Sequence, residues 1–193
     1  MQLLTTIEIL SVLFNFIFLI LLIKENKWCW PIGIIGSLLS VYLFAENKLY
    51  SEAILYAFYV LAGIYGWLVW SGYLTSKKEL KISTWKIKTH FIALLIGIIG
   101  MLGLGYYFDN FSDGKKPYFD AFSTSFSFVA TYMEAHKILS AWVYWIILNF
   151  FSVWLYSSRN LNIYAGLMVV YAIASVWGLI EWRKKHEIGL AAV

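Results

Sequence analysis

The chain has 193 residues, of which 61% are hydrophobic and only 13% are charged, with a formal net charge of +4. A mean hydropathy of +0.71 excludes an ordinary water-soluble domain, in which about a quarter of the residues are charged. The basic residues lie in short segments between apolar runs, so we expect them to set membrane topology and we exclude a nucleic-acid partner.

Long apolar runs recur along the whole chain, and a run of about 18 or more such residues can cross a hydrocarbon core about 30 Å thick. The chain is therefore expected to be an all-α integral membrane protein. The runs predict seven transmembrane helices, at residues 6–23, 29–46, 51–71, 89–108, 118–135, 140–157 and 162–182. No Lys or Arg precedes the first run and no cleavage pattern follows it, so we interpret it as a retained helix rather than a signal peptide.

Seven crossings divide the 15 Lys and Arg residues into two unequal groups. One side of the membrane receives eleven of them and the other side four, namely Lys48, Lys115, Lys116 and Arg159. Cytoplasmic loops carry the excess of basic residues, so we expect a multi-pass protein of the cytoplasmic (inner) membrane with its N-terminus outside and its C-terminus inside.

An internal repeat organises these helices. Sliding the chain by 112 residues without a gap superimposes residues that are hard to match by chance: Trp30 on Trp142, Tyr59 on Tyr171, Gly66 on Gly178 and Trp70 on Trp182. Equivalent points are four crossings apart, so the two three-helix units are expected to be parallel, with the fourth helix as a reversing linker. This 3+1+3 arrangement predicts a first unit, a linker segment and a second unit at residues 1–73, 74–116 and 117–193. Parallel repeats of this kind occur in small transporters, which bind substrate near the midplane where the units meet.

In the third helix, Glu52, Tyr56 and Tyr59 share one side because they are spaced i, i+4 and i+7. A carboxylate there is suited to attract a cation. The alternative is a Glu that stabilises the positive end of its own helix at the membrane surface.

An aromatic and polar stripe marks the sixth helix, where Trp142, Trp145 and Asn149 follow i, i+3 and i+7. The repeat places Trp30, Gly33 and Ser37 at the matching positions of helix two, so one unit has bulky groups where the other has small ones. We expect a cavity beside Trp145 for a flat heterocycle that stacks on the rings. The alternative is that the small residues allow close helix packing.

Helix five adds Thr131, which either lines the pocket or hydrogen-bonds its own backbone. Glu134 lies close to His136 and Lys137, and we expect it to form an interfacial ion pair. Asp120 is interpreted as an outer-end residue rather than a proton carrier. Phosphate-loop and zinc motifs are absent, and so is a catalytic cluster, so we expect no enzyme, no cofactor and no metal, and facilitated diffusion is the simplest mechanism.

Several segments together resemble the PnuC family of vitamin transporters: Lys27-Trp28-Cys29-Trp30-Pro31, Tyr65-Gly66-Trp67, Phe119-Asp120-Ala121-Phe122 and Trp142-x-x-Trp145-x-x-x-Asn149. The resemblance covers nearly the whole chain. It implies a SWEET-like fold, a homotrimer in the lipid bilayer, and facilitated uptake of an unphosphorylated B vitamin that a cytoplasmic kinase traps. It also implies that Trp142, Trp145 and Asn149 contact the ligand.

Within that family, the resemblance favours the thiamine branch, often called PnuT. Members that carry nicotinamide riboside tend to have Gln where this chain has Tyr56 and Thr131. Glu52 and the tryptophans also suit the positive thiazolium of thiamine. Nicotinamide riboside is a flat cation too and is the alternative substrate. A ligand-free structural or interaction protein of the membrane is the alternative of another class.

Overall fold

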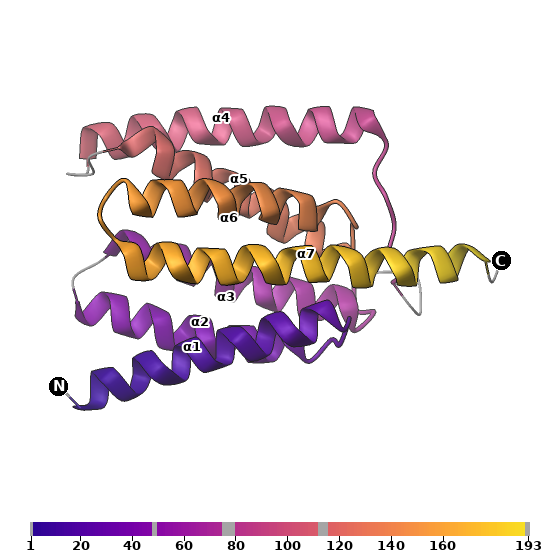
Figure 1. The fold of residues 1–193 in the computed structure, drawn as a ribbon, viewed down its shortest axis with the longest axis horizontal. Helices are drawn as coiled ribbons and strands as arrows, with labels where there is room; N and C mark the ends of the chain where they lie inside the picture. The colour runs from indigo at the N-terminus through magenta and orange to yellow at the C-terminus, as the bar shows by residue number, and fades with distance from the viewer. Residues whose placement is uncertain (1, 48–49, 75–79, 112–115, 192–193) are drawn as a thin grey trace. The chain divides into compact units, whose positions relative to one another are not determined.

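The computed structural model describes residues 2–47, 50–74, 80–111 and 116–191. Within these residues the chain forms seven α-helices and no β-strand (Figure 1). The helices are α1 (Gln2–Ile23), α2 (Cys29–Glu46), α3 (Tyr50–Trp70), α4 (Ile87–Phe111), α5 (Pro117–Ala135), α6 (Ala141–Ser157) and α7 (Asn162–Ala191). The seven predicted helices and the all-α class are confirmed.

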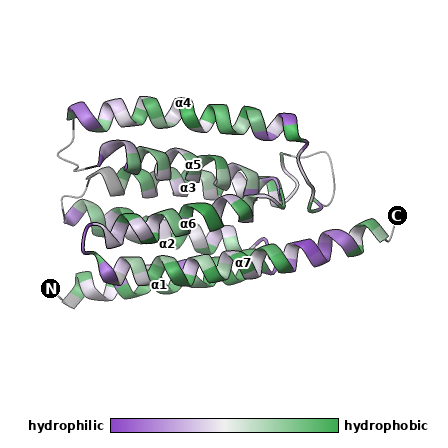
Figure 2. Ribbon diagram, turned by 45° about the horizontal axis from the view of Figure 1, so that its top comes forward, coloured by the Kyte–Doolittle hydropathy of each residue, from purple (hydrophilic) through white to green (hydrophobic). Residues whose placement is uncertain are grey.

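The largest difference from the predicted boundaries is the length of α7, which runs 30 residues to Ala191. Its apolar part gives way to a polar stretch before the C-terminus (Figure 2). Within that stretch, side chains one turn apart pair, Arg183 with Glu187 at 2.9 Å and Lys184 with Glu181 at 3.4 Å, and these pairs favour the helix slightly.

Five of the described helices are long and apolar enough to cross a membrane, namely α1, α2, α3, α4 and α7. The apolar α6 has 17 residues and falls just short of that length. The 19 residues of α5 include several Ser and Thr side chains, which lower its hydropathy. Polar side chains on α5 need hydrogen-bond partners within the protein, and polar residues inside membrane proteins are commonly functional.

Two compact units make up the chain, Met1–Leu80 and Lys81–Val193. In the first unit, α2 packs against both α1 and α3. Trp30 of α2 lies over Gly66 of α3, where a side chain would meet its ring. The ring also makes an edge contact with Trp70, at a centroid distance of 5.6 Å. This tryptophan-on-glycine contact brings α2 and α3 close together.

The second unit contains α4 to α7, each helix packed against the next along the chain. Small residues of α4 face α5, where Gly97 lies against Phe126 and Gly105 against Tyr118. Ser125 of α5 donates a hydrogen bond of 2.9 Å to the Gly97 carbonyl. Helix α4 is therefore closely packed against α5 within the second unit.

The tryptophan-on-glycine contact of the first unit recurs in the second. Trp142 of α6 lies over Gly178 of α7, with its ring edge-on to Trp182 at 5.4 Å and 88°. The corresponding angle for Trp30 and Trp70 is 85°. Each of these residues is 112 positions from its counterpart, so the paired residues of the sequence repeat have the same packing role in both units.

The segment before α4 is held against the turn between α5 and α6. Ser83 accepts a backbone hydrogen bond of 2.9 Å from Leu139 and donates one of 3.0 Å to the Lys137 carbonyl. His186 of α7 lies 2.9 Å from the Ile82 carbonyl through Nδ1. This segment, residues 82–84, is called the strap; it covers the turn between α5 and α6, and its Ile82 and the Ile138 of that turn are both buried.

Candidate functional site

The aromatic stripe of α6 lies within the second unit, where two of its three residues face α7. Trp142 is 1% exposed, between Gly178 and Trp182. Asn149 is buried and donates a 3.1 Å hydrogen bond through Nδ2 to the Ser175 hydroxyl. In this structure, both side chains hold α6 against α7.

Trp145 instead faces α5, and it is only partly buried. Its ring packs against the cluster that contains Phe126, Ala130 and Leu148. Its Nε1 is buried and makes no hydrogen bond of normal geometry with any described residue, although it lies near the carboxylate of Glu134. The buried Nε1 atoms of Trp30 and Trp142 also make no hydrogen bond with the described residues, so Trp145 differs from them by its partial exposure and by the carboxylate beside it.

On α5, Ala130, Thr131 and Glu134 share the face that borders Trp145, because residues three and four apart are neighbours on a helix. The Thr131 hydroxyl donates a 2.8 Å hydrogen bond to the Ser127 carbonyl of its own helix. Glu134 is only 4% exposed. The structure therefore places Glu134 near Trp145, whereas Thr131, one turn before Glu134 on α5, is bonded to its own helix backbone.

The expected interfacial ion pair of Glu134 is wrong. Among the described residues, the salt bridges use Asp120, Glu181 and Glu187, and none uses Glu134. The chain reverses directly after α5, so that Lys137, with a φ of 51°, donates its backbone N–H to the Glu134 carbonyl at 2.9 Å. This turn and the strap cover the end of α5 and bury a carboxylate that the sequence places at the membrane surface.

The two repeats differ in side-chain size at matching positions, and in each unit the neighbouring helix carries a side chain of complementary size. In the first unit, Gly33 lies against Phe18, whose ring fills the space that a side chain would take. In the second unit, Trp145 replaces Gly33 and Ala130 replaces Phe18, both at the 112-residue shift. The large side chain is thus Phe18 on α1 in the first unit and Trp145 on α6 in the second unit. Gly33 allows α1 and α2 to pack closely.

The remaining candidate residues lie in the first unit. Trp30 is 2% exposed and packs on Gly66, Trp70 and Phe18, as described for α2. Tyr56 stacks on Phe44 with centroids 5.3 Å apart and meets Tyr59 edge-on at 5.8 Å. These two tyrosines therefore form an aromatic cluster on α3. The side chain of Glu52 lies outside the described part of the chain.

Asp120 pairs with Arg159 near the start of α5, in a two-pronged contact of 2.9 and 2.8 Å. These hydrogen bonds raise the pKa of the Arg159 guanidinium, and the nearby Asp120 charge adds to the effect. The pair agrees with the interpretation of Asp120 as an end residue that is not a proton carrier.

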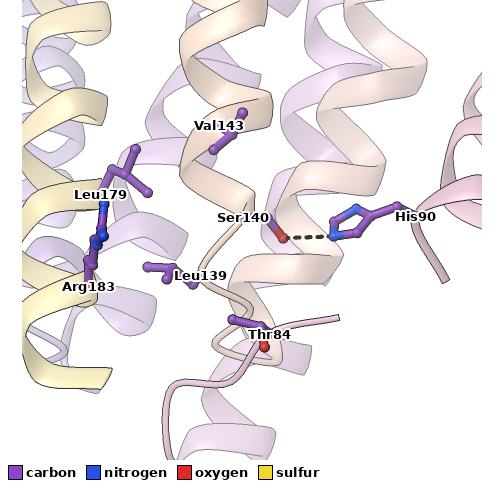
Figure 3. A pocket seen from close by; sticks show the side chains of 7 residues that line it. All are labelled: Thr84, His90, Leu139, Ser140, Val143, Leu179 and Arg183. Atoms are coloured by element: carbon purple, nitrogen blue, oxygen red, sulfur yellow. Dashed lines mark hydrogen bonds between the residues drawn. The ribbon is translucent and has the colours of Figure 1, made fainter. Parts of the chain in front are cut away.

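A pocket of about 370 Å³ opens beside the α5–α6 turn (Figure 3), and sequence reasoning missed it. It is lined by Thr84, His90, Leu139, Ser140, Val143, Leu179 and Arg183. His90 Nε2 lies 3.3 Å from the Ser140 hydroxyl, and its Nδ1 lies 3.4 Å from the Tyr144 hydroxyl. Ser140 and Val143 are on a different face of α6 from Trp145. The lining comes from four separate segments, so no local sequence signal could have identified it.

Comparison with known proteins agrees with this architecture. The family model described as nicotinamide mononucleotide transporter matches residues 5–184. The riboflavin/roseoflavin transporter RibM of Streptomyces davaonensis is 23% identical over 164 residues, which are 82% of this chain and 76% of that protein. The nicotinamide riboside transporter PnuC of Escherichia coli K12 is 23% identical over 175 residues, covering 78% of this chain and 73% of that protein.

A solved structure shares the fold. The crystal structure of the vitamin B3 transporter PnuC superimposes with a TM-score of 0.74 at 19% sequence identity, covering 92% of this chain and 80% of the other. These relatives and this fold are those of membrane transporters and not of enzymes. The chain thus belongs to the nicotinamide mononucleotide transporter family, the PnuC family of vitamin transporters.

Proposed function

We propose that this protein carries an unphosphorylated, flat heteroaromatic vitamin across the cytoplasmic membrane by facilitated diffusion. The family match and the transporter relatives support uptake of a vitamin-like molecule. The sequence contains no ATP-binding motif that would power transport. A cytoplasmic kinase that phosphorylates the vitamin would then make uptake unidirectional.

Nicotinamide riboside is our first candidate substrate, and thiamine is the second. The comparisons favour nicotinamide riboside, because a curated relative is named as its transporter and the solved structure is titled a vitamin B3 transporter. This order reverses the expectation from sequence, which placed thiamine first. Thiamine stays a candidate because Tyr56 and Thr131 replace the Gln residues typical of nicotinamide riboside carriers.

The observation that carries this proposal is the Trp145 face of α6. The indole is half-buried beside Ala130, and its buried Nε1 lies near the Glu134 carboxylate. Stacking of a base on an aromatic side chain contributes about 1–3 kcal/mol. Trp145 would supply this stacking surface, while Trp142 and Asn149 keep α6 in place against α7.

The proposal includes an orientation and an assembly. Eleven of the 15 basic residues fall on one side of seven crossings, which supports a cytoplasmic C-terminus. A homotrimer is the assembly expected for the family. Cysteine labelling from either side of sealed vesicles would test the orientation, and the native mass in detergent would test the trimer.

Purified protein in liposomes tests the function and its site together. Nicotinamide riboside, thiamine and riboflavin would each be supplied with label, and at least one should enter saturably. Trp145→Ala should weaken binding of that substrate by about 1–3 kcal/mol. The matched control is Trp177→Ala, since Trp177 is 44% exposed on α7. Equal affinity in the two variants would assign Trp145 to packing alone.

A further inference from the structure

Glu134 is a buried carboxylate that packing alone does not explain. It lies in the last turn of α5 and is 4% exposed. Its sequence neighbours Met133 and Ala135 are 0% and 1% exposed, and the adjacent cluster also includes Ile138 and Ala141. An isolated carboxylate in such surroundings is very unfavourable unless it is neutralised by a proton or by a cation. Ionisable residues inside membrane proteins are generally functional for this reason.

Among the described residues, the partner that lies near the Glu134 carboxylate is neutral. The indole N–H of Trp145 lies near the carboxylate, and within the described chain no Lys, Arg or His forms a salt bridge with Glu134. An indole can donate a hydrogen bond, but it cannot neutralise a negative charge. The structure therefore places a buried carboxyl group, with no cationic partner among the described residues, beside the aromatic ring of Trp145.

We infer that Glu134 and Trp145 form a subsite for the positively charged ring of the substrate. The ring of a pyridinium or thiazolium would stack on Trp145, and its fixed charge would pair with the Glu134 carboxylate. Ala130 and Thr131 border this subsite on α5, and Thr131 keeps its hydroxyl on the Ser127 carbonyl. This inference rests on the proposed function and narrows it to vitamins with a permanent ring cation.

That substrate class separates the candidates by charge. Nicotinamide riboside and thiamine carry a fixed positive charge on a flat ring, whereas the isoalloxazine of riboflavin is neutral. A carboxylate desolvated in the protein favours the cations and disfavours a neutral ring of the same shape, which would leave the buried charge unpaired. The protein should thus reject riboflavin, although RibM, which is as similar to this chain as the nicotinamide riboside transporter PnuC is, is named as a riboflavin transporter.

Matched pairs of ligands test the charge directly. Nicotinamide riboside is compared with its reduced dihydro form, and thiamine with its neutral oxidation product thiochrome. Wild type should bind the cation of at least one pair about tenfold more tightly than the neutral member, the scale of one charge-assisted contact. Glu134→Gln keeps the shape and removes the charge, so the preference should fall to about twofold or less, mainly through weaker cation binding.

Control variants separate charge from folding. Glu187→Gln removes a carboxylate on the exposed end of α7 and should leave the preference unchanged. If Glu134→Gln does not fold, Glu134→Asp keeps the charge on a shorter side chain and should keep the preference for cations. An unchanged preference in Glu134→Gln, or equal losses for charged and neutral ligands, would overturn the inference.

The outcomes distinguish this inference from the proposed function. Wild-type protein that transports riboflavin as well as the cations would refute the cation subsite and leave vitamin transport standing. Wild-type protein that binds and transports none of these vitamins would refute the proposed function itself.

Discussion

Gly178→Ala tests the tryptophan-on-glycine contact between α6 and α7. A Cβ atom at this position would lie 2.6 Å from three ring atoms of Trp142, far closer than packed carbons approach. The ring is rigid and held by Trp182, so either the ring or α7 has to move. Overpacking of this kind costs about 1–3 kcal/mol, whereas the gain in helix propensity from Gly to Ala is at most about 1 kcal/mol.

The assay is thermal unfolding of the purified protein in detergent, with Gly166→Ala as the control on the same helix. Nothing lies within 4 Å of a Cβ at Gly166, so that variant should melt at or above the wild-type temperature. For a chain of this size, each kcal/mol corresponds to about 2–4 °C, so Gly178→Ala should melt clearly below both. Gly66→Ala should behave like Gly178→Ala, because Trp30 occupies the matching position in the first unit.

A double variant checks the stated cause. If the clash is with the indole, the smaller ring of Trp142→Phe should relieve it, and the two substitutions together should cost less than the sum of their separate effects. Additive losses, or equal melting temperatures for Gly178→Ala and Gly166→Ala, would refute the proposed contact between α6 and α7.

Two further predictions concern the ends of α5. Asp120→Asn should lower the free energy of unfolding by about 1 kcal/mol, because it breaks the ion pair with Arg159. Adding Arg159→Gln should cost little more, since the contact is already lost. A double-mutant cycle of melting temperatures tests this. Burial lowers the pKa of His136 below 6.5, so the folded state binds fewer protons than the unfolded chain as pH falls. Stability should be complete above pH 6.5 and decline through the lowered folded pKa. His136→Gln should flatten this acid-side decline of the melting temperature; an unchanged slope would assign it to another group.

The helices were predictable from sequence because each rests on a continuous apolar run that bilayer thickness selects. The sequence also indicated that Trp30 and Gly66 correspond to Trp142 and Gly178, because these less common residue types coincide at a shift of 112 residues. The continuation of α7 beyond residue 182 was missed, since its charged residues are typical of a tail and their pairing one turn apart shows only in three dimensions.

The site was predictable only in part. Helical periodicity groups Trp142, Trp145 and Asn149 on one face, but about 100° per residue leaves an angle between the two tryptophans, so one meets α7 and the other α5. The filling of Gly33 by Phe18 depends on contacts between helices, which no single-helix pattern contains.

The burial of Glu134 could not be predicted from its position in the sequence. Its neighbours His136 and Lys137 suggest a membrane surface, but the strap through Ser83 and the tight reversal after α5 cover it. The reversal is local, but the pairing of Ser83 with the turn around Ile138 joins distant parts of the chain, so its effect on Glu134 appears only in the folded structure.

Uptake by vesicles with and without a kinase tests the central claim most directly. Labelled nicotinamide riboside should enter proteoliposomes saturably and stop when the inner and outer concentrations are equal. Sealing a nicotinamide riboside kinase and ATP inside should raise the internal label well above that level, because the phosphorylated product cannot leave. If thiamine is the substrate, the same experiment with its own kinase gives this result. Uptake no faster than in protein-free vesicles for every vitamin, or accumulation above the outer concentration without a kinase, would contradict facilitated diffusion.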